Sequence, residues 1–543
     1  MAITPSVHRT TGRPQIRDLD SLPTIDRSLI DYDSYHRFIG HAGVKYSMAV
    51  QATRGCPYKC FYCDIYKTTK NHFRRTVDHM FGEVKMLADL GVRRIEFIDD
   101  IFNVNRKDFI EFFQLVLKHK LNLQFFFPTG LKGDLLDRDM IDLMVEGGSV
   151  GINLSLEHAS PRMQKVMRKG LDVDLLHENL DYITTKYPSV ILTLNAMHGF
   201  PTETEEEAMM TLNFIKSIKW IDFAYLHNVR IFPGTELEQF ALEVGVPREV
   251  IAQSQDMSYH ENAPTLPFSA EFTRGVRASF LRDYVLNRER LLQVLPHQME
   301  QFSEDELNQK YNSYFPTDKI KTLDDVFKLA KISRTELRPL KPFSEDAVRI
   351  PELKTKLAKQ FPRQKPKTDP FRLMLIDLST YFSHDVDTRE YNVLEPPLGL
   401  MTLVSYINRE MPGEVDSLVL KSRIDFDDYD GLLKIVERFS PDMIGIRAMT
   451  FYKGFFHDTA AYLRKQGIRT PIVVGGPYPT ASYVEILKDE NIDFAVVGEG
   501  EVTLVEILRK MIANGKRPLD IEALRNIEGV AFLDKSEKET MAA

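Results

Sequence analysis

Short apolar runs alternate with amphipathic segments from Tyr46 onward, and this alternation constrains the fold more than any other feature of the chain. Six such runs occur before residue 240, at 46–53, 93–100, 123–130, 150–157, 189–201 and 223–235. The segments between them carry apolar residues at helical spacing. Strands that alternate with helices predict parallel β/α units. Six units fit a partial (β/α)6 barrel, whose functional side chains gather at the carboxyl ends of the strands.

A second series of the same kind follows residue 370. Its expected strands are 371–378, 414–420, 442–449, 471–477 and 492–501, and a helical pattern follows each of them. This order predicts an α/β domain with a doubly wound, flavodoxin-like or Rossmann-like sheet and ligands at the strand carboxyl ends. We therefore expect five segments: a lead-in at 1–44, the barrel at 45–240, a helical extension at 241–340, a linker at 341–370 and the doubly wound domain at 371–543.

Composition excludes several classes of protein. The 543 residues are 43% hydrophobic, and the net charge of -8 argues against nucleic acid as the main ligand. No apolar run reaches the roughly 18 residues that a membrane span needs. The polar N-terminus lacks the apolar core of a signal peptide, so a cytoplasmic location is expected.

Cysteine usage gives the strongest chemical signal. The chain has three cysteines, Cys56, Cys60 and Cys63, in the loop "RGCPYKCFYC" after the first expected strand. An odd number of closely spaced cysteines disfavours a disulfide framework. Zinc would need a fourth ligand nearby, and His72 is the nearest histidine. Thiolates are also the usual ligands of iron–sulfur clusters, and three thiolates on a four-iron cluster leave one iron open.

With this Cys-x3-Cys-x2-Cys pattern the chain resembles the radical S-adenosylmethionine (SAM) superfamily. The resemblance implies that Cys56, Cys60 and Cys63 hold a 4Fe-4S cluster, which splits bound SAM to start radical chemistry. It also implies further cofactor-binding residues along the expected strands. These candidates are Tyr62, Asp99, Asp100, Ser155, Glu157, Arg168, Gly199 and Pro201. Tyr62 and the "GFPTET" turn would lie beside the adenine, and Arg168 would pair with the SAM carboxylate.

The second β/α series resembles the cobalamin-binding domain found beside many radical SAM modules. The matching stretches are "EPPLGLMTLVSYI", "PDMIGIRAMT", "VVGGPYPT" and "VVGEGEVTLVEIL". They imply cobalamin contacts at Leu398, Gly399, Arg447, Thr450, Gly475, Gly476, Tyr478, Gly498 and Gly500. The Asp-x-His-x-x-Gly motif is absent, so no protein histidine is expected on cobalt. Tyr478 stands where the family commonly has histidine.

The order of the two modules is the reverse of the family's usual order, and the chain therefore resembles a circular permutation. If so, the two ends should lie together. Gly529–Leu533 is a short apolar run that would leave a strand edge unpaired. Ile3–Arg9 is a short segment that needs to be tied down. We expect the two to pair as a small antiparallel ribbon.

Three functions remain open from the sequence. The leading hypothesis is a cobalamin-dependent radical enzyme that methylates an unactivated carbon of an unknown small molecule. The alternatives are a cobalamin-dependent radical cyclase or rearrangement enzyme, and a non-catalytic Fe-S or cobalamin sensor. The resemblance implies an electron donor such as flavodoxin or ferredoxin as a partner, and composition predicts no nucleic acid and no membrane span.

Overall fold

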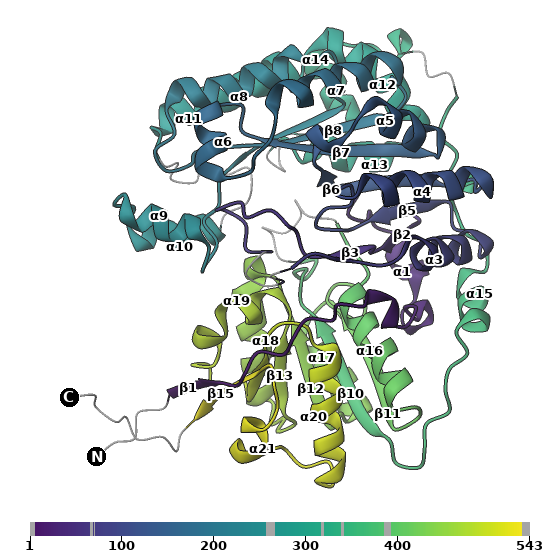
Figure 1. The fold of residues 1–543 in the computed structure, drawn as a ribbon, viewed down its shortest axis with the longest axis vertical. Coiled ribbons are helices and arrows are strands. Elements are labelled where there is room, and N and C mark those ends of the chain that lie inside the picture. The colour runs from purple at the N-terminus through teal and green to yellow at the C-terminus, as the bar shows by residue number, and fades with distance from the viewer. Residues whose placement is uncertain are drawn as a thin grey trace. The chain divides into compact units, whose positions relative to one another are not determined.

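The computed structural model describes residues 6–65, 69, 71–256, 267–315, 320–337, 341–384 and 393–534 (Figure 1). The chain divides into two compact units, which we describe separately. The first unit comprises His36–Pro351 and Glu390–Leu394. The second comprises Met1–Tyr35, Glu352–Arg389 and Glu395–Ala543. Among the described residues, no helix is long and apolar enough to cross a membrane.

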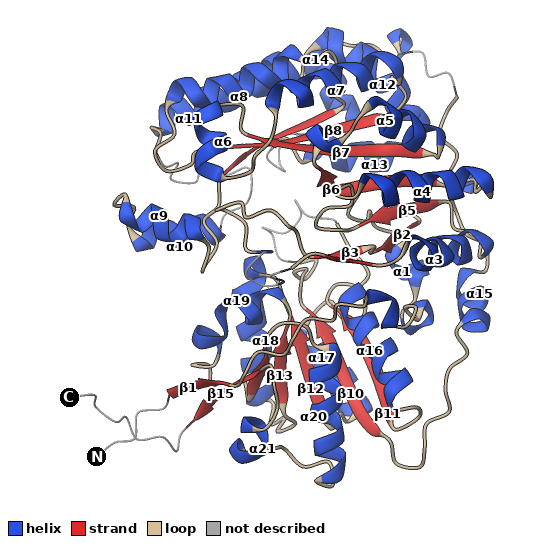
Figure 2. Cartoon of the chain, in the orientation of Figure 1, coloured by secondary structure: helices blue, strands red, loops and turns tan. Residues whose placement is uncertain are grey.

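The first unit is built on a six-stranded sheet in the order β2-β5-β6-β7-β8-β9, with every neighbouring pair parallel (Figure 2). Its strands are β2 (Ser47–Val50), β5 (Arg94–Phe97), β6 (Gln124–Leu131), β7 (Ser149–Glu157), β8 (Ile191–His198) and β9 (Phe223–Asn228). This confirms the predicted series of parallel β/α units. Among the residues that the structure describes, no pairing between β9 and β2 closes the sheet.

Helices connect these strands, and a side-chain cap marks where most of them begin. The helices are α3 (Val77–Asp89), α4 (Arg106–Lys118), α5 (Arg138–Glu146), α6 (Pro161–Met167), α7 (Val173–Lys186) and α8 (Glu205–Ser217). Each cap accepts a backbone N–H of the first turn, as Thr76 does for α3 and Thr204 for α8. Helix α7 was not predicted. Its apolar stripe is interrupted by Asn179, whose amide donates to the Gly133 and Leu136 carbonyls.

The helical extension follows β9, and its residues 288–312 close the amino ends of the strands in the first unit. It contains α9 (Glu236–Glu243), α10 (Arg248–Asp256), α11 (Ala270–Phe280), α12 (Arg288–Gln301), α13 (Glu304–Asn312) and α14 (Leu323–Ala330). Arg94, the first residue of β5, forms a 2.7 Å ion pair with Glu306, and both side chains are fully buried. Gln298 donates to Asp222, just before β9, at 3.0 Å. The polar side chains at this end therefore pair with one another inside the protein. The carboxyl ends of the strands remain for a site.

The second unit has a seven-stranded sheet in the order β1-β15-β14-β13-β12-β10-β11. Its strands are β10 (Phe371–Asp377), β11 (Val415–Lys421), β12 (Met443–Arg447), β13 (Ile472–Gly475), β14 (Phe494–Val496), β15 (Val530–Asp534) and β1 (Ser6–Arg9). The five strands from β10 to β14 are parallel. Their order, second-first-third-fourth-fifth, is the flavodoxin-like one. This confirms the predicted doubly wound sheet, and its switch point lies between β10 and β12.

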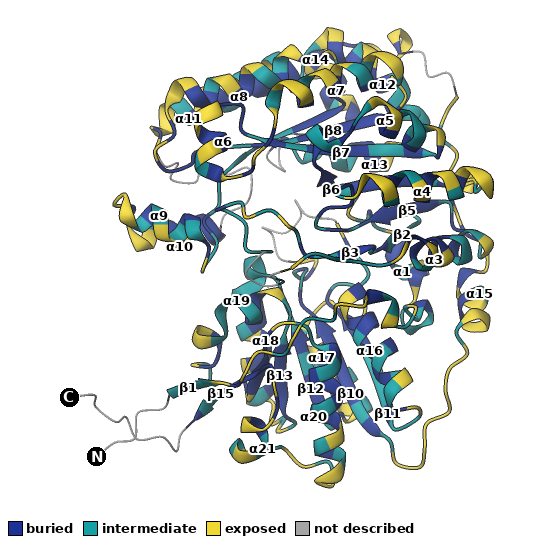
Figure 3. Ribbon diagram, viewed as in Figure 1, coloured by how far each residue is buried: buried dark blue, intermediate teal, exposed yellow. Residues whose placement is uncertain are grey.

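Helices cover both faces of this sheet and bury two apolar cores (Figure 3). Helices α16 (Leu398–Glu410) and α20 (Glu501–Ala513) contribute to one core. Helices α17 (Tyr429–Phe439), α18 (Lys453–Lys465) and α19 (Pro477–Ile486) contribute to the other. The segment 341–370, predicted as a linker, contains the helix α15 (Leu353–Gln360).

The two ends of the chain pair as expected. Strand β1 runs antiparallel to β15, with Val7 opposite Leu533. Residues 3–5 of the predicted ribbon lie outside the described part of the chain. The lead-in then follows the second unit, where Arg13 donates to Thr503 at 2.9 Å and the Ile16 amide donates to Glu499 at 2.7 Å. These contacts tie the lead-in as far as Tyr35 to the second unit, whereas residues 36–44 belong to the first.

Candidate functional site

The cysteine loop follows strand β2 and is anchored through its backbone. The Asp99 carboxylate accepts hydrogen bonds from the Ala52 and Thr53 amides and from the Thr53 hydroxyl. Asp100 accepts from the Gly55 amide at 2.9 Å, one residue before Cys56. Asp99 and Asp100 therefore hold the entrance of the loop, and burial raises the pKa of Asp99 to about 6. Their predicted contact with SAM stays a prediction.

The far side of the loop is held by two other elements of the same unit. The Phe61 amide donates to the Met167 carbonyl at 3.1 Å, at the end of α6. The Phe61 carbonyl accepts from the Leu237 amide at 2.9 Å, in the first turn of α9. The Phe61 ring stacks on Phe200 with ring centroids 6.0 Å apart. Because Cys60 and Cys63 flank Phe61, these contacts fix the backbone that carries the thiols.

The three thiols lie near one another in a partly buried environment. Burial, together with the neighbouring thiols, raises the pKa of Cys56 to about 11 and that of Cys63 to about 12. Tyr62 donates a hydrogen bond to the Cys60 sulfur, which favours its thiolate. Neutral thiols of this kind become thiolates when a metal binds, because the metal replaces the proton.

A cationic side chain, that of Lys169, faces these sulfurs next to Arg168, whose predicted contact with the SAM carboxylate stays a prediction. Lys169 pairs with Glu157 at 2.9 Å, and its charge lowers the pKa values of Cys56 and Cys60. Arg168, the predicted residue, takes a left-handed backbone conformation at the end of α6 and pairs with Glu236, with about half of its side chain exposed. The sequence shows two adjacent basic residues here. The left-handed backbone at Arg168 turns that side chain away and leaves Lys169 facing Glu157.

Strand β7 brings two further predicted residues to the same end of the sheet. Glu157 is its last residue and has a positive φ of 61°. Its charge raises the pKa of the buried Tyr62 hydroxyl, in addition to the larger effect of burial. Ser155 lies against Gly130 of β6, where a Cβ would stand 2.6 Å from the serine Oγ. Glycine at 130 therefore makes room for this hydroxyl.

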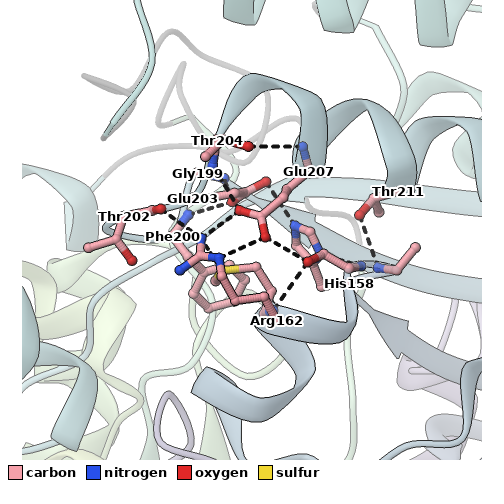
Figure 4. Close-up of polar contacts among 12 residues, drawn as sticks. His158, Arg162, Gly199, Phe200, Thr202, Glu203, Thr204, Glu207 and Thr211 are labelled. Carbon is pink, nitrogen blue, oxygen red and sulfur yellow. Dashed lines mark hydrogen bonds and ion pairs between the residues drawn. The ribbon is translucent and has the colours of Figure 1, made fainter.

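The predicted turn at Gly199–Thr204 is fixed by a buried carboxylate (Figure 4). Glu203 accepts from the Gly199 amide at 2.7 Å and from the Phe200 amide at 2.8 Å. Its other oxygen lies 2.9 Å from His158 Nε2, and neither side chain is exposed. Since His158 Nδ1 accepts from the Ser160 amide, Nε2 carries the proton and donates. Pro201 is buried in the same turn.

In the second unit, three charged residues meet at the switch point of the sheet. Asp377, Lys421 and Arg447 are the last residues of β10, β11 and β12. Arg447 lies 2.8 Å from the Asp377 carboxylate, and Lys421 lies 3.3 Å from it. Although burial opposes it, these two cations hold the pKa of Asp377 well below its usual range. Sequence reasoning selected Arg447 and missed its two companions.

The glycines predicted at this edge differ in their surroundings. Gly476 has a φ of 96°, and a Cβ there would lie 2.7 Å from Arg447 Cγ. Gly498 also has a φ of 96°, and its amide donates to Thr480 at 3.1 Å. Gly399, in the first turn of α16, has open space where a side chain would extend. At Gly500, a Cβ would meet Leu403 at 3.2 Å.

The remaining predicted residues lie at helix starts along the same edge. Leu398 begins α16, and Thr450 begins the short 3-10 helix Thr450–Tyr452 before α18. The Tyr478 hydroxyl, at the start of α19, lies 3.2 Å from His457 Nε2. His457 Nδ1 in turn lies 2.6 Å from the Asp489 carboxylate. The cobalamin contacts expected of all these residues stay predictions.

The donor sets of the two units fit the cofactors that the sequence implies. Three thiols in one anchored loop are the ligands that a 4Fe-4S cluster takes with one iron left open. Within the described ranges, no group of three or more His, Cys, Asp and Glu side chains is gathered closely enough to hold a single metal ion. In the second unit, the open space at Gly399 and Gly498 lies at the edge where doubly wound sheets bind ligands.

Two family models match the chain. The radical SAM superfamily matches residues 50–215, and the B12 binding domain matches residues 386–508. The uncharacterized methyltransferase PH0819 of Pyrococcus horikoshii is 28% identical over 239 residues, which cover 44% of this chain and 50% of that protein. A tRNA-2-methylthio-N(6)-dimethylallyladenosine synthase of Aquifex aeolicus is 28% identical over 248 residues, covering 44% and 54%. The chain therefore spans about half the length of these curated relatives.

Solved structures of similar proteins match only distantly. The radical SAM methyltransferase TsrM from Kitasatospora setae, with cobalamin and a 4Fe-4S cluster bound, has a TM-score of 0.33 and 19% identity, covering 38% of this chain and 41% of its own. The cobalamin-dependent radical enzyme OxsB, with aqua-cobalamin and SAM bound, has a TM-score of 0.30 and 14% identity, covering 52% and 45%.

Proposed function

Because this chain carries a radical SAM domain and, later in the sequence, a B12-binding domain, we propose that it is a cobalamin-dependent radical SAM methyltransferase. Its cofactors are a 4Fe-4S cluster, SAM and cobalamin. Its reaction is the methylation of an unactivated carbon of a small molecule. When bound, the cluster and SAM supply a radical that removes a hydrogen atom, and cobalamin supplies the methyl group.

The observation that carries the proposal is the anchored triad of thiols beside the Glu157–Lys169 pair. Cys56, Cys60 and Cys63 hold the cluster. The amino-acid end of SAM has one ammonium and one carboxylate, and Glu157 and Lys169 offer the complementary charges 2.9 Å apart. Both side chains are largely buried, so each strengthens its interaction with an incoming charge in a low-dielectric site.

The roles of the other residues follow from their contacts. Asp99 and Asp100 position the cysteine loop through its amides, and Glu203 positions the turn at Gly199 and Pro201 for the adenine. Arg447, Gly475, Gly476, Gly498 and Gly399 form the cobalamin edge of the second unit. The methyltransferase among the relatives supports methyl transfer as the reaction. A flavodoxin-type or ferredoxin-type donor supplies the electron, and the protein works in the cytoplasm.

The test is anaerobic reconstitution of the full chain with iron, sulfide, cobalamin and SAM, followed by analysis of the nucleoside products. We expect both 5'-deoxyadenosine and S-adenosylhomocysteine, because methyl transfer consumes one SAM as radical source and one as methyl source. Formation of 5'-deoxyadenosine alone would favour the cyclase, and formation of neither would favour the sensor. The Cys60→Ala variant, treated identically, should form neither product.

A further inference from the structure

Two fully buried side chains join the connection after β7 to the turn after β8 (Figure 4). His158 directly follows Glu157, and Glu203 lies in the turn predicted to hold the adenine. His158 Nε2 and Glu203 Oε1 are 2.9 Å apart, and neither side chain is exposed. A carboxylate removed from water costs free energy unless hydrogen-bond donors surround it. Within the described chain, the His158 ring and the Gly199 and Phe200 amides are those donors.

Helix α6 fixes the direction in which the His158 ring donates. Ser160 caps this helix, since its hydroxyl accepts from the Met163 amide at 3.3 Å. The Ser160 backbone amide donates to His158 Nδ1 at 3.0 Å, and the Gln164 side chain donates to the His158 carbonyl. Because Nδ1 is an acceptor, the ring proton lies on Nε2 and is directed at Glu203. The start of α6 therefore holds His158 as a donor to the carboxylate.

The turn that Glu203 holds is also in contact with the cysteine loop. The Phe200 ring centroid lies 6.0 Å from those of both Phe61 and Tyr62. The Phe61 amide in turn donates to the last residue of α6. Helix α6 thus contacts His158 at its start and the cysteine loop at its end. The hydrogen bond from His158 to Glu203 links the strand end proposed to bind the amino-acid half of SAM with the turn proposed to bind its adenine.

We propose that His158 is a positioning residue for SAM. Its Nε2–H holds the Glu203 carboxylate, which fixes the Gly199 and Phe200 amides, so that the adenine subsite is already formed when SAM binds. The inference rests on the proposed function, because it assigns a role within the SAM site of that function. Without the His158 donor, the turn loses part of its fixed geometry. Binding of the adenine then has to order the turn, which lowers the affinity.

The two halves of SAM can be measured separately and without turnover. The probes are 5'-deoxyadenosine and methionine, titrated calorimetrically into the full chain after anaerobic reconstitution of the cluster. We expect His158→Leu to bind 5'-deoxyadenosine roughly tenfold more weakly, because a hydrogen bond to a charged group contributes on that order. Its affinity for methionine should stay within about twofold, because Glu157 and Lys169 are unchanged. His158→Gln, which keeps an N–H donor toward Glu203, should restore most of the affinity for 5'-deoxyadenosine.

The matched control is Gln298→Leu. Gln298 is fully buried and donates to the buried Asp222 carboxylate at 3.0 Å, at the amino ends of the strands. Its removal also deprives a buried carboxylate of a donor, but away from the turn, so affinity for both probes should stay within about twofold. Should His158→Leu fail to fold, Glu203→Gln tests the same contact. Either orientation of the new amide sets an N–H against a donor, so we expect the same selective loss of affinity for 5'-deoxyadenosine.

The outcomes separate positioning from stability alone. Equal losses of affinity for the two probes in His158→Leu would overturn the inference. Equal losses of affinity for 5'-deoxyadenosine in His158→Leu and Gln298→Leu, or no binding of 5'-deoxyadenosine by the native protein, would also overturn it. Binding of 5'-deoxyadenosine that depends on His158, in a protein that forms no 5'-deoxyadenosine from SAM, would instead count against the proposed function alone. Iron content confirms that each variant keeps its cluster.

Discussion

At the residue scale, the environment of the cysteine loop depends on one backbone reversal. Arg168 ends α6 in the left-handed region, which turns its side chain toward Glu236 and leaves Lys169 facing Glu157. The proximity of the three thiols could be predicted from the sequence, because one loop carries all three cysteines within eight residues. The choice between two adjacent basic residues could not, since it rests on a φ of 55° at Arg168.

This arrangement makes Lys169 and Arg168 a matched pair for mutation. We expect Lys169→Met to weaken SAM binding about tenfold, since it removes the proposed charge-assisted contact to the SAM carboxylate. Arg168→Met, whose side chain is half exposed, should leave SAM affinity within about twofold. Equilibrium binding of SAM to the reconstituted protein measures both, with iron content confirming that each variant keeps its cluster. Equal losses in the two variants would contradict the assignment.

His198 gives the first unit a specific sensitivity to acid. Burial, together with the charges of His158, Arg277 and His227, lowers its pKa to about 4. The unfolded chain protonates this histidine near pH 6.5 and the folded chain does not, so stability is full above pH 6.5 and falls as the pH drops to 4. The difference between the unfolded and folded pKa values corresponds to a loss of about 3 kcal/mol in the free energy of unfolding between pH 6.5 and pH 4.

Substitution of this residue should remove the acid sensitivity. His198→Phe keeps an aromatic ring against Phe268, which stacks on His198 in the native protein. The urea midpoint of this variant should fall less between pH 7 and pH 4.5 than that of the unmodified protein. His177→Gln, at a half-exposed position on α7, should retain the native pH dependence. A His198→Phe profile that matches the native one would show that the buried imidazole is not the cause.

At the scale of elements, the predicted strands were largely confirmed, whereas helices such as α7 and α15 were missed. Strands such as β10 and β13 are nearly continuous apolar runs, as buried parallel strands require. Helix α7 has Leu176, Leu180 and Ile183 at helical spacing, but Asn179 sits in that stripe and bonds to carbonyls outside the helix. The Asn179 side chain obscured the helical spacing of the apolar residues. Its hydrogen-bond partners lie in another element, and the sequence alone does not show that contact.

The join between the two chain ends depends on one threonine side chain. The Thr10 hydroxyl donates to the Val530 carbonyl at 3.1 Å and accepts from the Val530 amide at 3.0 Å. Thr10→Val keeps the shape but leaves the Val530 amide without its acceptor, so we expect a loss of about 1–3 kcal/mol in the second unit. Thr11→Val, at an exposed position, should change stability by less than about 0.5 kcal/mol. Hydrogen exchange of the β15 amides measures both.

At the scale of the whole molecule, the sequence predicted two β/α series but not every further segment that packs onto each of them. The pairing of β1 with β15 followed from an unpaired strand edge and is confirmed. The way residues 288–312 close the amino ends of the first sheet was not predicted. It depends on long-range contacts such as Arg94 with Glu306, 212 residues apart, which leave no local pattern.

The central claim is that two units of one chain hold two different cofactors. It is tested most directly by measuring iron and cobalt per chain after anaerobic reconstitution, in the native protein and in two variants. Cys60→Ala removes a cluster ligand. Gly399→Phe fills open space at the predicted cobalamin edge without a strained backbone, since Gly399 lies in a regular helix. The native protein should contain about four iron atoms and about one cobalt atom per chain.

The two variants should lose different metals. We expect Cys60→Ala to lose iron and keep cobalt, and Gly399→Phe to keep iron and lose cobalt. In the cobalt-loaded native protein, the electron paramagnetic resonance spectrum of cob(II)alamin should not change when the protein is labelled with nitrogen-15, because no histidine of the chain binds cobalt. Loss of both metals in either folded variant, or a native protein that retains no corrinoid, would contradict the account.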